Sequence, residues 1–179
     1  MELEELKQDC AIKQKKGLHF ILASVIIWTL LSITYSLDLP ILTKNFIAFC
    51  CTAPLVPIAY FISKIIKVDF QNKSNPLTNL GILFSVNQII YLLIAMWIFS
   101  AMPDKMLMVL AIIFGAHLMP YGWLYGSKSY MILSVVIPIG ALIIGLNFEP
   151  NILAFIMIGV EVLFSLALFF ENRAYRKAE

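Results

Sequence analysis

Long apolar runs separated by short polar segments dominate the chain. A helix needs ~20 residues to cross a hydrocarbon core of ~30 Å, because each residue adds ~1.5 Å. Six runs reach about this length: Leu18–Ser36, Phe46–Ile62, Leu80–Met102, Met106–Tyr125, Tyr130–Leu146 and Ile152–Phe170. The pattern predicts an all-α, polytopic membrane protein with six transmembrane helices within residues 17–171. Residues 1–16 are then an N-terminal lead, and residues 172–179 are a C-terminal tail.

The composition excludes an ordinary soluble domain. Of the 179 residues, 61% are hydrophobic and 13% are charged, whereas soluble domains carry about 25% charged residues. The surface of the protein must therefore face a lipid bilayer. The net charge of +2 is too small to indicate a nucleic-acid partner.

The basic residues predict the orientation of the helices. With the N-terminus inside, only Lys44 and Lys105 of the 13 basic residues fall in outside loops. The inside residues are Lys7, Lys13, Lys15, Lys16, Lys64, Lys67, Lys73, Lys128, Arg173, Arg176 and Lys177. Such an excess of positive charge marks the cytoplasmic side. We therefore expect a protein of the cytoplasmic membrane with both termini in the cytoplasm.

The N-terminal lead and the cysteines narrow the possibilities further. No small-residue cleavage site follows the first apolar run, so we expect that run to remain in the mature protein. Cys10 belongs to the lead, and Cys50 and Cys51 are adjacent inside the second run. This spacing indicates neither a disulfide framework nor a zinc finger. The sequence predicts no bound metal and no cofactor.

A weak internal repeat relates the first two helices to the next two. Shifted by 63 residues, APLVPIAYF (53–61) aligns with AHLMPYGWL (116–124), and Pro40 aligns with Pro103. The offset stays constant across two helices and their loop, which favours a duplicated hairpin in the same orientation. Chance similarity between apolar segments is the alternative. Parallel repeats are one arrangement from which transporters are built, although other membrane proteins also contain them.

Four polar side chains share one level near the middle of the membrane. His117 and Glu161 lie close to the middle of the fourth and sixth runs, and Asn87 and Gln88 lie ~5 Å from the middle of the third. A carboxylate facing lipid at this depth costs at least ~2–3 kcal/mol, so Glu161 should face the protein interior, either protonated or paired. The four residues are our candidate ligand- or proton-binding site, with contact between His117 and Glu161 as a hypothesis. Structural hydrogen bonding between helices is the alternative.

Prolines and glycines indicate how the helices bend and pack. Pro54, Pro57, Pro120 and Pro138 lie inside apolar runs, where each removes a backbone N–H, so we expect helix breaks around a cavity. The general frequency of proline in membrane helices is the alternative. Gly122 and Gly126 form a GxxxG pattern that permits close helix approach within one chain. The less favoured interpretation of this pattern is a homo-oligomer interface.

Motifs of known enzymes are missing from the sequence. It contains no HExxH, GxSxG, Walker loop or glycine-rich fingerprint, so we expect no enzyme. The leading expectation is binding or transport of a small solute, ion or proton. The alternatives are a non-transporting sensor or complex subunit and, less favoured, an intramembrane enzyme.

Three segments carry a family resemblance. They are QKKGLHFILASVIIW (14–28), NPLTNLGILFSVNQIIYLLIAMW (75–97) and IIFGAHLMPYGWLY (112–125). Together they resemble a family of small bacterial integral membrane proteins of unknown function. The resemblance implies a six-helix protein of the bacterial inner membrane, and it assigns no catalytic or binding residues.

Overall fold

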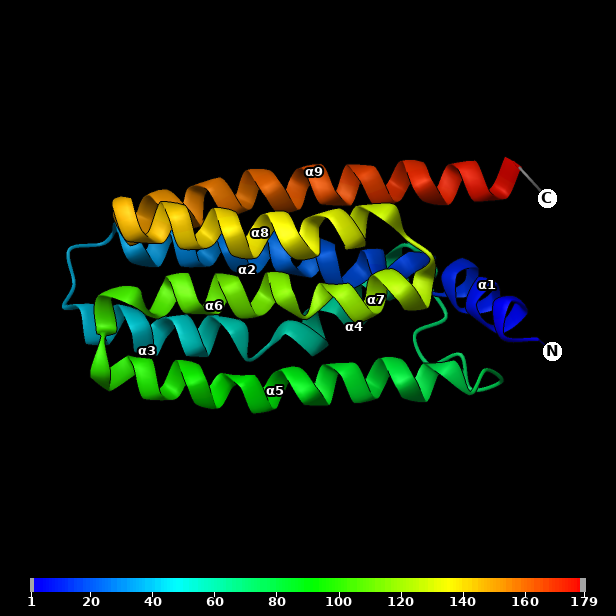
Figure 1. The fold of residues 1–179 in the computed structure, drawn as a ribbon, viewed down its shortest axis with the longest axis horizontal. Helices are drawn as coiled ribbons and strands as arrows, with labels where there is room; N and C mark the ends of the chain where they lie inside the picture. Colours follow the sequence, from blue (N-terminus) through cyan, green and yellow to red (C-terminus); the bar gives the residue numbers. More distant parts are fainter. Residues whose placement is uncertain (1, 178–179) are drawn as a thin grey trace.

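The computed structural model describes residues 2–177, with side chains up to Ala174, and this part of the chain is helical without any strand (Figure 1). The helices are α1 (Leu3–Lys13), α2 (Leu18–Ser36), α3 (Ile41–Thr52), α4 (Leu55–Ile65), α5 (Leu77–Ala101), α6 (Met106–Ala116), α7 (Leu118–Tyr125), α8 (Lys128–Asn147) and α9 (Pro150–Lys177). Two short 3-10 turns, η1 (Lys15–Gly17) and η2 (Pro103–Lys105), precede α2 and α6. The side chains of Arg176 and Lys177, and residues 178–179 of the predicted tail, lie outside this description.

Within residues 2–177, six helical segments are long and apolar enough to cross a membrane, which confirms the predicted all-α, six-helix fold. They are Lys15–Ser36, Ile41–Ile65, Leu77–Ala101, Pro103–Tyr125, Lys128–Asn147 and Pro150–Ala174. The protein is thus a multi-pass membrane protein. An even number of crossings brings both chain ends to the same end of the bundle, where α1 also lies (Figure 1). We call this the terminal end.

The second span begins earlier than predicted, because a polar turn belongs to it. The structure starts α3 at Ile41, ahead of the polar segment that the sequence analysis left outside the membrane. Within this turn Asn45 is fully buried, and its Oδ1 accepts a hydrogen bond of 2.6 Å from the Tyr35 hydroxyl. Its Nδ2 donates to the carbonyl of Pro103 at 2.9 Å. These bonds join α2, α3 and η2, so the polar side chain serves the packing of the helix.

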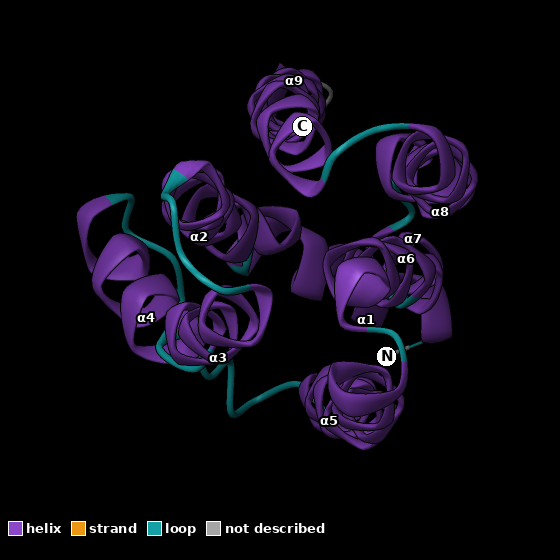
Figure 2. Cartoon of the chain, turned by 90° about the vertical axis from the view of Figure 1, so that its left-hand side faces the viewer, coloured by secondary structure: helices purple, strands orange, loops and turns teal. Residues whose placement is uncertain are grey.

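The helices form an incomplete ring when viewed along the bundle (Figure 2). The most extensive packing joins α2 to α9 and α6 to α8. Glycines permit the second of these contacts: a Cβ added to Gly115 would lie 2.5 Å from the Pro138 side chain, and one added to Gly145 would lie 2.5 Å from Met108. Helix α5 packs mainly on α6 and α7, and most of its side chains are exposed. Close contact through small residues is how helices associate in lipid.

Two spans are interrupted at matching positions. Residues 53–54 separate α3 from α4, and His117 separates α6 from α7. The 63-residue offset aligns these breaks and also aligns Pro57 with Pro120. Each of these two prolines lacks the N–H that would bond to the carbonyl four residues earlier, at Ala53 and Ala116, which is where the helix ends. The equivalence agrees with the repeat hypothesis, although duplication itself stays a prediction.

Pro138 does not break its helix, contrary to our expectation. Helix α8 runs continuously from Lys128 to Asn147, with Pro138 inside it. The proline ring lies against Gly115 of α6, whose missing side chain leaves room for it. A single lost hydrogen bond is tolerated in a membrane helix that neighbouring helices support.

The two glycines of the GxxxG pattern, Gly122 and Gly126, have roles within a single chain. A Cβ on Gly122 would come within 2.6 Å of the Met131 sulfur, so this position brings α7 close to α8. Gly126 ends α7 in the left-handed conformation, with φ of 54°, as a helix C-cap commonly does. These contacts account for the pattern within one chain, and homo-oligomerisation stays a prediction.

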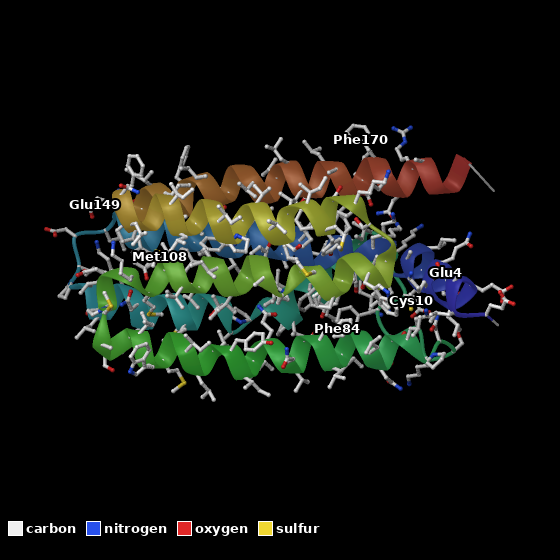
Figure 3. The ribbon with its side chains drawn as sticks, in the orientation of Figure 1. Glu4, Cys10, Phe84, Met108, Glu149 and Phe170 are labelled. Atoms are coloured by element: carbon white, nitrogen blue, oxygen red, sulfur yellow. The ribbon has the colours of Figure 1, made fainter. Side chains whose placement is uncertain are left out.

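Charged side chains gather at the two ends of the bundle, as Glu4 at the terminal end and Glu149 at the other illustrate (Figure 3). At the terminal end α1 is held by Asp9, whose Oδ1 pairs with Lys13 at 2.6 Å. The Asp9 Oδ2 accepts hydrogen bonds from Asn72 and Asn75, at 3.0 and 2.7 Å. Burial acts to raise the pKa of Asp9, but the hydrogen bonds from Lys13, Asn75 and Asn72 together lower this pKa to about 2. Helix α1 is thus fixed to the loop between α4 and α5.

Candidate functional site

A pocket of about 170 Å³ lies between the helices, with walls from α2, α4, α5, α6, α7 and α8. We call it the central pocket. Its apolar lining includes Ile21, Leu55, Val56, Ile89, Phe114 and Leu118. The polar groups in its wall include Ser24, Ser85, Gln88 and His117. Ser24, Gln88 and His117 each lie within a few residues of the middle of their membrane span, so the pocket reaches mid-membrane depth.

Glu161 lies behind the wall of this pocket and is joined to it by Ser24. The Glu161 side chain is fully buried on α9, and its Oε2 is hydrogen-bonded to the Ser24 hydroxyl on α2. The same hydroxyl lies 2.7 Å from the carbonyl oxygen of Ile21. The other carboxyl oxygen of Glu161, Oε1, has no hydrogen-bond partner among the described residues. The predicted inward orientation of Glu161 is therefore what the structure shows.

His117 lies at the break between α6 and α7 and lines the central pocket. Its backbone N–H donates to the carbonyl of Ile113 at 3.1 Å. Its ring packs edge-on against Phe114 and Tyr121, with centroid distances of 5.5 and 6.0 Å. The Nδ1 atom is buried, and the backbone carbonyls of Phe114 and Ile113 lie close to the ring. The helix break thus places the imidazole ring in the wall of the pocket.

The hypothesis that His117 contacts Glu161 is wrong for this structure. No ion pair or hydrogen bond joins the two side chains, both of which are described. Ser24 of α2 is the hydrogen-bonding partner of Glu161, whereas His117 has aromatic neighbours on its own span. His117 and Glu161 lie at the same depth without touching, because the Ser24 hydroxyl of α2 is the hydrogen-bond partner of the Glu161 carboxyl group.

The two neighbouring amides of α5 face different ways. Gln88 is half-buried and lines the central pocket, as expected. Asn87 is exposed on the outside of α5, where its Nδ2 donates to the Tyr91 hydroxyl at 2.8 Å. Adjacent positions on a helix point about 100° apart, and here Gln88 lies on the pocket side of α5 whereas Asn87 does not. Asn87 is therefore not a pocket residue, which corrects the sequence-based assignment.

A second pocket, of about 430 Å³, continues the first toward the terminal end. We call it the entrance pocket. The two pockets share Phe20, Ser85, Tyr121 and Tyr125 as lining residues. The Ser85 and Tyr121 hydroxyls lie 2.6 Å apart, and Tyr121 also donates to the carbonyl of Gly81 at 2.9 Å. The boundary between the pockets is therefore a hydroxyl pair on α5 and α7 beside aromatic rings.

His19 is a residue of the entrance pocket that the sequence analysis missed. Only 2% of its surface is exposed, and its Nδ1 has no hydrogen-bond partner among the described residues. Its ring lies 4.5 Å from that of Phe20 and 5.3 Å from that of Phe70, measured between centroids. His19 lies near the start of α2, away from the middle of the span, and the distant loop residue Phe70 is one of the residues that bury it.

Ser24 was missed for a different reason. It lies near the middle of the first span, so the count of depth that located His117 and Glu161 would also have located Ser24. A serine hydroxyl in a helix commonly donates a hydrogen bond to a carbonyl of its own helix, as Ser24 does to Ile21. A serine at mid-membrane depth therefore does not by itself indicate a contact with another helix. Its role depends on the packing of α2 against α9, which the sequence does not reveal.

A half-buried carboxyl group, that of Glu171, joins three helices at the terminal end. Glu171 of α9 accepts hydrogen bonds from the Ser129 backbone and hydroxyl, at 3.0 and 2.6 Å. It also accepts from the Ser127 hydroxyl at 2.7 Å and pairs with Lys16 at 3.0 Å. A negative side chain at the first turn of α8 is stabilised by the helix dipole. This carboxyl group is bonded on both oxygens, so we assign it to the packing of α2, α8 and α9.

Among the described residues, no group of three or more His, Cys, Asp or Glu lies close enough together to hold a metal ion. No curated protein and no solved structure matches the chain. A model of a family described as "Family of unknown function (DUF7010)" matches residues 3–171. Because this match extends over nearly the whole chain, the protein belongs to the DUF7010 family.

Proposed function

We propose that this protein binds a small solute in the central pocket and holds a proton on Glu161 directly behind it. The observation that carries the proposal is the polar wall at mid-membrane depth: His117 and Gln88 line the pocket, and Ser24 joins it to Glu161. Unsatisfied polar atoms in a membrane interior are costly unless they have a ligand or a partner. Among the described residues, the Glu161 Oε1 is such an atom.

The hydrogen bonds of Ser24 support a neutral Glu161. A serine hydroxyl has one hydrogen, yet the Ser24 oxygen lies at hydrogen-bond distance from two oxygens, those of Ile21 and Glu161. Only one of these contacts can use the serine hydrogen. A carbonyl oxygen carries no hydrogen, so the Ile21 contact needs the serine proton, and the Glu161 contact needs a proton on the carboxyl. The chain of donors then runs from Glu161 to Ser24 to Ile21.

Transport is the extension of this proposal. Transporters built from repeats commonly bind their solute near the membrane midplane, beside helices that are interrupted there. The central pocket has that depth, and both α3–α4 and α6–α7 are interrupted beside it, at residues 53–54 and at His117. We further propose that the terminal end is cytoplasmic, because basic residues predominate in its loops.

A second candidate role is a structural one. Glu161 is fully buried and does not itself line the central pocket, and its bond to Ser24 ties α9 to α2. A non-transporting sensor or complex subunit would use this bond only to hold the bundle together. The two roles differ in whether the central pocket admits a polar solute.

The test of the proposed function is the reactivity of cysteines at two adjacent positions of α5. In a chain whose native Cys10, Cys50 and Cys51 are replaced by alanine, Gln88→Cys places a thiol in the pocket, and Asn87→Cys places one on the outer surface. We expect a small water-soluble thiol reagent to modify Gln88→Cys in lipid vesicles at least about tenfold faster than Asn87→Cys, because thiolates form only where water reaches. Equal rates, or an inert Gln88→Cys, would exclude a solute-accessible pocket.

A further inference from the structure

The central and entrance pockets together form one elongated space along α5. Their shared residues include Ser85 and Tyr121. Along α5 the lining extends from Pro76 in the entrance pocket to Ile89 in the central pocket. At ~1.5 Å per residue this distance is about 20 Å, or roughly two-thirds of the hydrocarbon thickness of a bilayer. A long, narrow ligand parallel to the helices fits such a space better than a compact one.

The polarity of the lining changes along this space. The entrance pocket presents Gln14, Gln71, Lys73 and Asn79 near the terminal end of the bundle. The central pocket is lined mainly by the aliphatic and aromatic side chains named above, with Gln88 and His117 as local exceptions. A ligand that occupies both pockets therefore needs one polar end and one apolar end.

The charge at the polar end is positive. Among the described residues that line the two pockets, Lys73 is the one with a full charge. Two acidic groups of this end, Asp9 and Asp69, are absent from the lining: Asp9 is bound by Lys13, Asn72 and Asn75, and the Asp69 Oδ1 accepts from the Asn72 backbone N–H. No described ion pair or hydrogen bond engages the Lys73 ammonium group. A ligand with a negatively charged end would therefore complement the positive charge of Lys73 in the wall of the entrance pocket.

A buried imidazole completes the polar end. The His19 side chain, at 2% exposure, lines the entrance pocket, and its Nδ1 lacks a partner among the described residues. A neutral imidazole nitrogen can donate or accept a hydrogen bond according to its tautomer. An oxygen-rich head group can therefore be bound by His19 from one side and by Lys73 from another.

We propose that the ligand of the two connected pockets is an anionic single-chain amphiphile with its head group at Lys73 and His19 and its chain in the central pocket. This inference rests on the proposed function and names the chemical class of the solute. The position of the head group matches the interfacial level at which the charged groups of amphiphiles lie. The side chains of α5 beside this space are largely exposed, which leaves the ligand a route of entry from the surrounding lipid.

Trp28 is a built-in reporter for the chain of such a ligand. Its ring lies 6.1 Å from that of Phe114, which lines the central pocket, and Trp28 itself is only 3% exposed. Trp97 and Trp123 are exposed and would respond to any lipid, so both are replaced by phenylalanine. The resulting protein is placed in vesicles of phosphatidylcholine. Stearate brominated at mid-chain is added as a quencher of tryptophan fluorescence. In a parallel titration, the uncharged alcohol with the same brominated chain replaces the stearate.

We expect saturable quenching of Trp28 by the brominated stearate, with an apparent affinity about fivefold higher than that of the alcohol. One charge-assisted contact at an exposed lysine supports a factor of about this size. Lys73→Gln should remove this preference, whereas Lys128→Gln, a lysine of the same end outside both pockets, should retain it. Ser85→Phe should abolish saturable quenching because it fills the boundary between the pockets. Leu83→Phe, on an exposed position of α5, should not.

Three results would overturn the inference. Equal affinities for stearate and alcohol, together with an unchanged Lys73→Gln, would exclude the charged head group. Equal quenching in Ser85→Phe and Leu83→Phe would place the ligand outside the pockets. Absence of saturable quenching while Gln88→Cys still reacts would exclude an amphiphile and leave the proposed function standing. If Gln88→Cys is inert as well, both proposals fail.

Discussion

Ser24 and Glu161 are hydrogen-bonded across 137 residues of chain, and their contact joins the middle of α2 to the middle of α9. These two helices form one of the most extensive pairs in the bundle. Because the Ser24 hydroxyl also contacts the Ile21 carbonyl, the pair is satisfied when Glu161 contributes the hydrogen. This relationship links the packing of the fold to the proton-binding role that we propose.

Replacement of Glu161 should change how stability depends on pH. If the folded protein keeps the proton on Glu161 while the unfolded chain releases it above about pH 4 to 5, the unfolded state binds fewer protons at neutral pH. The free energy of unfolding then falls as pH rises between pH 5 and 9, by up to ~1.4 kcal/mol per pH unit. We expect thermal unfolding of the detergent-solubilised wild type to show this slope and Glu161→Gln to lose it.

The control for this experiment is Glu149→Gln. Glu149 lies at the end of the bundle remote from the termini and should leave the pH slope unchanged (Figure 3). Coincident curves for wild type and Glu161→Gln would show that Glu161 keeps the same protonation in the folded and unfolded states across this range. The structural role would then be the better account of Glu161.

Gly115→Ala should destabilise the bundle by about 1–3 kcal/mol, the usual cost of overpacking a tight contact. The added Cβ would lie 2.5 Å from the Pro138 ring and 2.7 Å from an Ile137 methyl group, so α6 and α8 would have to move apart. Thermal unfolding in detergent measures the effect. Gly140→Ala on α8 is the matched control, since nothing lies within 4 Å of its Cβ position. Equal stability of the two variants would mean that α6 and α8 are not in close contact.

Asp9 should contribute stability that is lost in acid. Its folded pKa of about 2 is below the ordinary value of 3.8. The contribution is therefore fully present above about pH 4 and is lost as pH falls from there toward 2, when Asp9 takes up a proton in both states. We expect Asp9→Asn to be less stable than wild type at neutral pH and to lose less stability over that acid range.

Glu4→Gln is the comparison for Asp9. Glu4 is also in α1 and pairs with Lys7, but its side chain is 80% exposed, and exposed pairs contribute little. The acid-induced change of Glu4→Gln should therefore match that of wild type. An acid loss in Asp9→Asn as large as that of wild type would contradict the lowered pKa of Asp9.

The sequence predicted the membrane fold well, because membrane spans are determined by apolar length alone. It also placed Glu161 on the inner face of its helix, because a carboxylate that faces lipid at this depth is costly. The breaks near Pro57 and Pro120 were predictable, since a missing N–H acts locally. At Pro138 the same argument gave the wrong result, because the outcome depends on whether a neighbouring helix, here through Gly115, supports the site.

The contacts between side chains within the site could not be predicted from the sequence. Depth along a helix can be counted, but rotation about the helix axis and the choice of neighbour depend on packing between distant segments. Hence Asn87 and Gln88 could not be separated, and Ser24 was not recognised as the partner of Glu161. His19 shows the same limit, since Phe70, far along the chain, is one of the residues that bury it.

The protonation of Glu161 at neutral pH is the central claim, and infrared spectroscopy tests it most directly. A protonated carboxyl group has a C=O stretching band that is distinct from the bands of a carboxylate. The spectrum of wild type minus that of Glu161→Gln at pH 7 isolates this one side chain. Our account predicts a carboxylic-acid band in the difference spectrum, shifted in D₂O because its proton exchanges. A difference spectrum with carboxylate bands alone would contradict it.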